Sequence, residues 1–248
     1  TGAQPSLSRE MNQIVDRAEE EARGLGDDFV STEHLLLALE ATTGKVLWQT
    51  PNPRAWKMTH ASIMPMEFAG QRIYVYCASK GVVGVSAKDG SLLWETPDWK
   101  ISIATVPSPV PLPDGKIFLT GGYNAGSLML QVKKEGGRFV PRTLFRLEPE
   151  VFGATQHTPI LVDNHLYGVR ADGKFVCLTL EGKPVWASAA GQQFGLGPFI
   201  MADGLFFAIN DAAPATVVPE TQYQVRKRIG DIRQTLPQGV LGPFFNDE

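Results

Sequence analysis

The sequence predicts a mainly β fold built from repeated units, and three observations lead to this prediction. A turn followed by a tryptophan recurs along the chain: Trp48 and Trp94 are 46 residues apart, and Trp186 follows Trp94 by 92 residues, twice that spacing. Short runs of β-branched and aromatic residues fill the intervals, and 25 glycines and 18 prolines supply many turns. A period of 46 suits a four-stranded propeller blade. We therefore predict a partial β-propeller of about four 46-residue blades over residues 41–213, with a short α-helical segment at each end.

Each complete repeat is expected to contain four strands. In the first, the runs IMPMEF, RIYVYCA, VVGVSA and LLWET follow Trp48 and are separated by the turns AGQ, SKG and KDGS. The last complete repeat reads PILVD, HLYGVR, KFVCLTL and PVWASA, and GPFIMADGLFFAIN begins a further one. Between them we expect a repeat that has lost its tryptophan near residue 140. There LQVKKEGGRFVPRTLF places Phe139 or Val140 in the tryptophan position.

The turn-and-tryptophan segments resemble the quinoprotein (PQQ-like) repeat family. That family carries the motif A-x-D-x-x-T-G-x-x-x-W, and the segments 38–48, 84–94 and 177–186 are similar to it at the Gly and Trp positions. The resemblance implies that the tryptophan of one blade packs between neighbouring blades, and it is strongest to the non-enzymatic, BamB-like branch. It implies blade-docking roles for Gly44, Trp48, Gly90, Trp94, Gly182 and Trp186.

This resemblance implies a non-catalytic protein-binding or scaffold β-propeller, located in the periplasm or cell envelope. A cytoplasmic location stays open, because the chaperone family that the N-terminal segment resembles is cytoplasmic. One alternative is a remnant of a PQQ-dependent dehydrogenase, and a second is an efflux-associated periplasmic fragment. No transmembrane run is present, and the N-terminus TGAQPSLSRE lacks the charged and then apolar pattern of a signal peptide. The net charge of −3 gives no overall field that would attract nucleic acid.

No catalytic, cofactor-binding or metal-binding residues are predicted, so the chain is interpreted as a non-enzyme without a cofactor. Its candidate acids fall in Gly- or Asn-containing turns, where such side chains bond to the local backbone. The histidines are scattered along the chain and do not have the spacing of metal ligands. The acids are Asp89, Asp163, Asp172 and Asp203, and the histidines outside the N-terminal segment are His60, His157 and His165.

Two tryptophans lie outside the repeat positions. Trp56 and Trp99 occur in proline-containing loops, so we expect them to be more exposed than the docking tryptophans. They are the possible partner-binding residues of the chain, although packing over a blade edge is the favoured alternative. Cys77 and Cys177 each fall within a predicted strand, and we expect both to be free core residues.

The first 40 residues have a different pattern. LSREMNQIVDRAEEEARGLG has helical apolar spacing, and EHLLLALE (33–40) is predicted to be a second helix capped by Ser31 or Thr32. The stretch GDDFVSTEHLLLAL resembles half of the N-terminal domain of Clp ATPases, which receives substrates and adaptors. His34 within it is interpreted as a structural residue.

The C-terminal residues 214–248 change pattern again. A helix with one apolar face is followed by a Pro/Gly loop, and YQVRKRIGDIRQTLPQGVLGPFFNDE resembles the periplasmic porter region of RND efflux transporters. The chain is therefore interpreted as a mosaic of three pieces, recombined or artificial in preference to evolved as a unit. The incomplete ring leaves open propeller ends, and we expect self-association through them.

Overall fold

The computed structural model describes residues 34–208, which form five antiparallel sheets. Sheet I is a hairpin of β1 (His34–Leu39) and β2 (Val46–Pro51). Sheet II contains β3 (Met64–Phe68), β4 (Gln71–Ala78), β5 (Gly81–Ser86) and β6 (Leu92–Thr96). Sheet III contains β7 (Val110–Pro111), β8 (Lys116–Gly121), β9 (Gly126–Glu135) and β10 (Arg138–Leu147). Sheet IV contains β11 (Ile160–Val162), β12 (His165–Val169), β13 (Phe175–Thr179) and β14 (Pro184–Ala187), and sheet V is a hairpin of β15 (Phe199–Ala202) and β16 (Leu205–Ala208).

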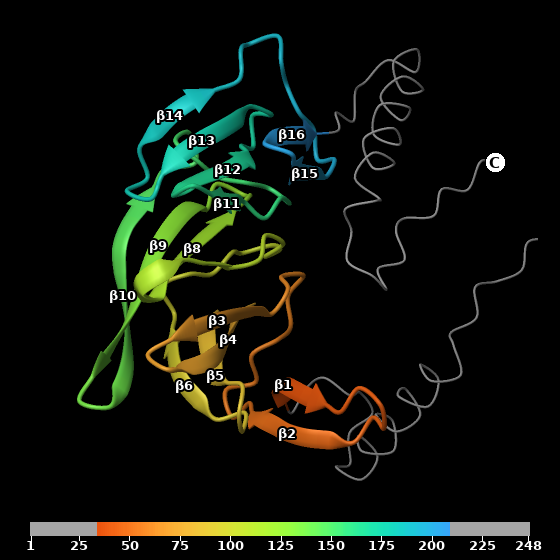
Figure 1. Ribbon diagram of the computed structural model, residues 1–248, viewed down its shortest axis with the longest axis vertical. Helices are drawn as coiled ribbons and strands as arrows, with labels where there is room; N and C mark the ends of the chain where they lie inside the picture. Colours follow the sequence, from red (N-terminus) through yellow and green to blue (C-terminus); the bar gives the residue numbers. More distant parts are fainter. Residues whose placement is uncertain (1–33, 209–248) are drawn as a thin grey trace, which may run out of the picture.

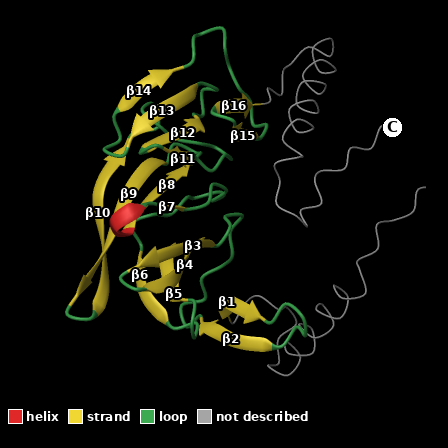
Figure 2. Ribbon diagram, viewed as in Figure 1, coloured by secondary structure: helices red, strands yellow, loops and turns green. Residues whose placement is uncertain are grey.

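The five sheets follow one another along an open arc, in chain order (Figure 1). In each four-stranded sheet, successive strands are hydrogen-bonded neighbours, as in a propeller blade. For the described part of the chain, Figure 2 shows strands and connecting loops, with one short 3-10 turn, η1 (Pro113–Gly115). Within residues 34–208, no helix has the length and apolar character needed to cross a bilayer. The predicted mainly β, partial-propeller fold is confirmed: three blades are complete and two are half-blades.

Several of the hairpins turn through two residues that both have positive φ. Asp163 and Asn164 join β11 to β12 with φ of 45° and 60°, and Val162 lies directly opposite His165. This is the type I′ geometry that matches the twist of the flanking strands, and Asn, Asp and Gly adopt it at low cost. The same geometry recurs at Ala69-Gly70, Gly136-Gly137 and Asp203-Gly204.

The prediction of a helix over residues 33–40 is wrong for its described part, because His34–Leu39 is strand β1. β1 pairs with β2 and places Ala38 opposite Trp48, as Gly84 lies opposite Trp94 in sheet II. The run of leucines satisfied a helical pattern over too few residues to form a helix without tertiary support. Pairing with β2 and burial of Leu36 against sheet II decide its conformation. The other predicted helices lie outside the described residues.

The hydrophobic core consists of layers between successive sheets. One layer joins sheets I and II, with Leu36 and Val83 among its members. A second joins sheets II and III around Val75 and Leu128. A third joins sheets III and IV, where Phe118 and Phe152 pack with ring centroids 6.0 Å apart and Leu178 completes the layer. Each sheet is therefore stabilised by its neighbours along the arc.

The hairpin of β9 and β10 reaches beyond its own sheet to sheet II (Figure 1). The Thr143 hydroxyl donates a hydrogen bond of 3.0 Å to Oδ2 of Asp98, and the Arg146 guanidinium donates to the Asp98 backbone carbonyl. A bulge at Leu144 interrupts the pairing register of β10. The extra residue shifts the in-and-out alternation of side chains by one position, so the face that odd-numbered residues occupy changes across the bulge.

Candidate functional site

Trp48 joins sheet I to sheet II through contacts with a turn of sheet II. Its indole Nε1 donates a hydrogen bond of 3.1 Å to the carbonyl of Ala87, in the turn between β5 and β6. Gly90 in the same turn has φ of +72°, and a Cβ built there would lie 2.5 Å from Cε3 of Trp48. The Thr50 hydroxyl adds a buried hydrogen bond of 2.8 Å to the Gly90 carbonyl. Glycine is thus needed both for the backbone conformation and for the close approach of the ring.

The equivalent contact between sheets III and IV is made by Phe145. A Cβ at Gly182, where φ is +77°, would lie 2.8 Å from Cε2 of Phe145. The prediction that Phe139 or Val140 holds the tryptophan position is therefore wrong. Phe139 instead packs toward sheet II, 6.2 Å from Phe68 between ring centroids. The extended hairpin and the bulge at Leu144 move the docking position further along β10.

Trp94 is buried, with 4% of its surface exposed, in the layer between sheets II and III. Its ring lies over Gly84, its cross-strand partner, where a Cβ would come within 2.1 Å of the indole. Unlike Trp48, its Nε1 has no hydrogen-bond partner. The turn Gly136-Gly137 of sheet III lies at the end of the long hairpin and has no atoms within 4 Å of a built Cβ. Trp94 therefore packs between blades without docking on a turn glycine.

Trp186 departs from the prediction that all three repeat tryptophans are buried, because 44% of its surface is exposed. It lies on β14, and its ring stacks on Phe175 with centroids 6.0 Å apart. Sheet V is only a hairpin, so among the described residues no turn between third and fourth strands follows sheet IV. Gly44, the turn residue of sheet I, has φ of +70° and bonds through its N–H to the Glu40 carbonyl at 2.8 Å.

The expectation that Trp56 and Trp99 are more exposed is wrong, since both are buried. Trp56 lies over the start of β5, where a Cβ at Gly81 would be 3.1 Å from its ring. Trp99 packs beside Gly121 at the end of β8, in the layer between sheets II and III. The loops that follow β2 and β6 thus fold back over the next sheet. Neither indole is available to a partner in this conformation.

One end of the sheets, which we call the loop face, carries the connections between sheets. The loop after β2 is tied to the turn between β4 and β5 by a 2.8 Å hydrogen bond from the Lys57 N–H to the Ser79 hydroxyl. The Ala171 N–H likewise donates to the Gly153 carbonyl at 2.8 Å. The loop face comprises residues 52–63, 97–109, 148–159 and 188–198.

Exposed apolar side chains lie on two loops of the loop face that are hydrogen-bonded to each other. The His60 N–H donates to the Thr105 carbonyl at 3.0 Å, and the Ser62 N–H donates to the Ser108 hydroxyl at 2.8 Å. Large apolar side chains flank these bonds on both loops and point away from the core. They are Met58 and Ile103, at 70% and 71% exposed, and Ile63 at 47%. No sequence pattern distinguished them from other loop residues.

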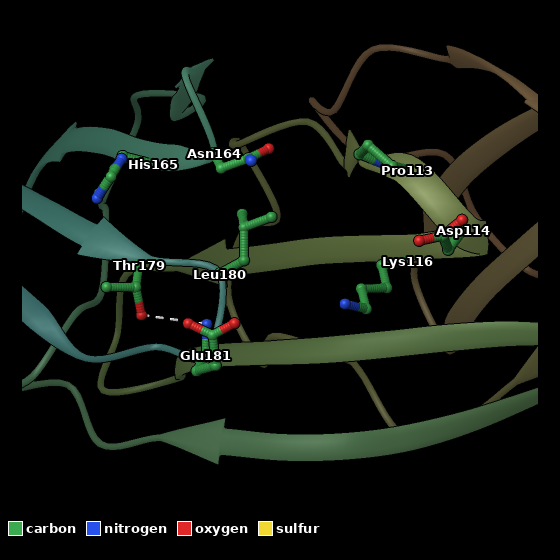
Figure 3. A pocket seen from close by; sticks show the side chains of 8 residues that line it. All are labelled: Pro113, Asp114, Lys116, Asn164, His165, Thr179, Leu180 and Glu181. Atoms are coloured by element: carbon green, nitrogen blue, oxygen red, sulfur yellow. Dashed lines mark hydrogen bonds between the residues drawn. The ribbon is translucent and has the colours of Figure 1, made fainter.

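The opposite end of the sheets, the turn face, has a polar cleft of about 430 Å³ between sheets III and IV (Figure 3). Lys116 and Glu181 lie on its two sides, and the Glu181 N–H donates to the Thr179 hydroxyl at 3.2 Å. A hydrogen bond from Thr179 and the nearby lysines lower the pKa of Glu181. Asp114 and His165 also line the cleft, so both acidic and basic side chains surround it.

A smaller cavity of about 180 Å³ lies on the loop face, where the loops 148–159 and 188–198 meet the turn between β12 and β13. His157 lines it, with Nε2 2.5 Å from the Gly197 carbonyl and Nδ1 without a partner. Arg170, also in the lining, forms an ion pair of 2.6 Å with Asp172 and donates to the Glu150 carbonyl. That ion pair lowers the pKa of Asp172, mainly through the hydrogen bond from Arg170.

The candidate acids occupy turns, as predicted from the sequence. Asp89 accepts hydrogen bonds from the Ser91 N–H and hydroxyl at 3.1 and 2.7 Å, and these bonds lower its pKa to about 2. Within residues 34–208, no group of three or more His, Cys, Asp or Glu side chains is arranged to hold a metal ion. Cys77 and Cys177 are buried free thiols, as predicted.

Comparison with known proteins identifies two segments. Residues 29–188 match the family described as outer membrane protein assembly factor BamB, and residues 1–47 match the Clp repeat (R) N-terminal domain. The chaperone protein ClpB of Bacteroides thetaiotaomicron is 49% identical over 39 residues, which are 16% of this chain and 4% of ClpB. Both family matches include the whole of β1. The first also includes the whole of β2, whereas the second ends within β2.

Two solved structures are similar. BamB from Moraxella catarrhalis aligns with a TM-score of 0.34 and 15% identity, over 62% of this chain and 58% of that one. Quinohemoprotein alcohol dehydrogenase from Comamonas testosteroni aligns with a TM-score of 0.45 and 14% identity, over 69% of this chain and 36% of that one. The chain thus spans less than two thirds of each of these relatives. Its match over residues 29–188 places it in the family of the outer membrane protein assembly factor BamB.

Proposed function

We propose that this chain is a non-catalytic protein-binding scaffold of the cell envelope that holds a protein partner on its loop face. Membership in the BamB family supports both the scaffold role and the envelope location. The main structural support is that two hydrogen-bonded loops expose the apolar side chains of Met58, Ile63 and Ile103. Large apolar side chains presented together on rigid loops are typical anchors for a protein partner.

The loops that carry these side chains are held in place from below. Trp56 is buried beneath the first loop, and the side chain of Asn52 accepts from and donates to its backbone at 2.9 Å. Trp99 anchors the second loop in the core. A surface that is already ordered loses little conformational entropy when a partner binds. Lys57 and Lys100 are exposed beside it, so the segment that binds should combine apolar side chains with acidic ones.

Site-specific photo-crosslinking tests this proposal. A photoreactive residue at position 58 or 103 is expected to capture a defined envelope protein, whereas one at Leu144, which is exposed on β10, should not. With that partner purified, the double variant Met58→Lys, Ile103→Lys should weaken binding about 100-fold, and Leu144→Lys should leave it unchanged. Equal capture from positions 58 and 144 would contradict the proposal.

The same preparation tests the dehydrogenase alternative. Purified chain mixed with PQQ and Ca²⁺ is expected to show no saturable binding and no reduction of a redox dye. Saturable binding together with dye reduction would favour the remnant of a PQQ-dependent dehydrogenase over the scaffold.

A further inference from the structure

The two half-blades at the ends of the arc are complementary halves of one blade. In sheet I, Ala38 lies opposite Trp48, as Gly84 lies opposite Trp94 on the third and fourth strands of sheet II. Sheet V instead begins a blade, because β15 and β16 follow the connection from β14 and are joined by a two-residue turn, as β11 and β12 are. Sheet V thus supplies the first two strands of a blade and sheet I supplies the last two.

Each half-blade has an unpaired edge at the position where the other half would join. Within residues 34–208, β16 pairs only with β15, and β1 pairs only with β2. An unpaired strand edge is a template for another strand. In one chain the two edges lie at opposite ends of the arc (Figure 1). The edge of β16 in one chain therefore has its structural complement in the edge of β1 in a second chain.

We propose that two copies of this chain close into one ring, in which β16 of each copy pairs with β1 of the other. Each copy contributes three complete sheets and two complementary halves. Two copies then provide eight four-stranded blades, within the range of about four to eight found in closed propellers. A two-fold axis relates the two contacts, which together close the ring and pair the facing edges of β16 and β1 in both composite blades. The proposal does not depend on which protein binds the loop face.

The side chains of sheet V support a neighbouring sheet on its open face. Phe199 and Phe206 face sheet IV, with ring centroids 5.2 and 5.1 Å from that of Phe175. Ile200 and Leu205 alternate with them along the hairpin and point to the other side, where they are 52% and 51% exposed. An apolar face of this kind is normally covered by the next blade. In the ring it would meet sheet II of the second copy.

The exposed Trp186 gains a docking turn in the same arrangement. Trp48 docks on the turn of the next sheet at Gly90, and the composite blade would place the turn of sheet I, with Gly44, after β14 of the other copy. The two turns match: φ is +70° at Gly44 and +72° at Gly90, and both N–H groups bond to the residue four positions earlier. Gly44 is already buried in the single chain, so docking of Trp186 requires a rearrangement at this turn.

Light scattering coupled to gel filtration tests the closure of the ring. The chain at tens of micromolar is expected to have the mass of a dimer. Ile200→Lys with Leu205→Lys should raise the dimer dissociation constant about 100-fold, and these exposed positions leave folding of the single chain intact. Leu144→Lys, a matched exposed leucine on β10, should have no effect. A monomer at this concentration, or open-ended polymers, would overturn the proposal.

Crosslinking distinguishes the partner strand. Chains with Leu37→Cys on β1 are mixed with chains with Phe207→Cys on β16, and a short bis-maleimide reagent tolerates a small difference in register. Covalent dimers should form in the mixture but not from either variant alone, and the buried Cys77 and Cys177 should leave the unmodified chain uncrosslinked. A chain that carries both cysteines and crosslinks within itself as a monomer would contradict pairing between copies.

Discussion

The indole of Trp48 lies so close to Gly90 of the next sheet that a Cβ on the glycine would be 2.5 Å from the ring. Phe145 and Gly182 repeat this relationship two sheets further along the arc. In both pairs an aromatic side chain on the outermost strand of one sheet fits the turn of the next. The sheets are therefore held in order by specific contacts as well as by the apolar layers between them.

The contact between Trp48 and Gly90 predicts a strong effect of Gly90→Ala on stability. The substitution adds a clash with the indole to the strain of an alanine at φ of +72°, and we expect a loss of about 2–5 kcal/mol in the free energy of unfolding. Gly70→Ala is the matched control, because φ is +81° there but nothing lies within 4 Å of the added Cβ. It should cost about 1–2 kcal/mol. Urea unfolding that gives equal losses for the two variants would contradict the docking contact.

The repeat tryptophans should differ in their contributions to stability. Trp94→Ala removes a ring buried between sheets II and III and should cost about 3–5 kcal/mol. Trp186→Ala removes a ring that is nearly half exposed and should cost about 1–2 kcal/mol at high dilution, where chains are separate. Denaturant unfolding monitored by circular dichroism measures both. A loss below about 1 kcal/mol for Trp94→Ala would show that the repeat register is wrong.

The repeat architecture was accessible to sequence reasoning because it rests on local signals. The 46-residue spacing from Trp48 to Trp94 and the turn residues fixed the order of the strands, and the half-blade begun by GPFIMADGLFFAIN is sheet V. Turn chemistry at Asp163-Asn164 depends only on the two residues concerned, so it is visible in one dimension. Burial of Cys77 and Cys177 followed from their places within apolar strands.

Features set by contacts between distant segments were predicted poorly. The leucines of His34–Leu39 suit a short helix or a strand, and only pairing with β2 selects the strand. Trp56 and Trp99 occur in loops, and nothing local shows that these loops fold over the next sheet. The contact of Phe145 with Gly182 was not predicted, because the bulge at Leu144 shifts the register of β10. The exposure of Met58 and Ile103 depends on how two loops pack together.

Asp89 should titrate well below an ordinary aspartate. Hydrogen bonds from Ser91 hold its pKa at about 2. The ionised carboxylate therefore stabilises the folded chain at pH values above the ordinary pKa of aspartate, and this stabilisation is lost as the pH falls through about 2. Ser91→Ala should raise the pKa of Asp89 toward its ordinary value. An NMR titration of the side-chain carboxyl measures both values, and a pKa unchanged by the substitution would show that Ser91 is not the cause.

The two cysteines should be unreactive in the folded chain. Burial raises the pKa of the Cys77 thiol to about 12 and also raises the pKa of Cys177, so little thiolate exists near neutral pH. We expect no reaction with a disulfide reagent at pH 8 and reaction of both thiols in denaturant. Rapid reaction of either thiol under native conditions would mean that its sheet opens readily.

Hydrogen exchange measured peptide by peptide shows whether a run of docked propeller blades forms the stable body of this chain. We expect the strongest protection in β4, β5, β8 and β9, which have hydrogen-bonded neighbours on both edges and lie between covered faces. Sheets I and V should exchange faster in a dilute sample, because within the described residues neither contains a strand that is hydrogen-bonded on both edges. Stronger protection in residues 34–51 than in residues 71–132 would contradict the account.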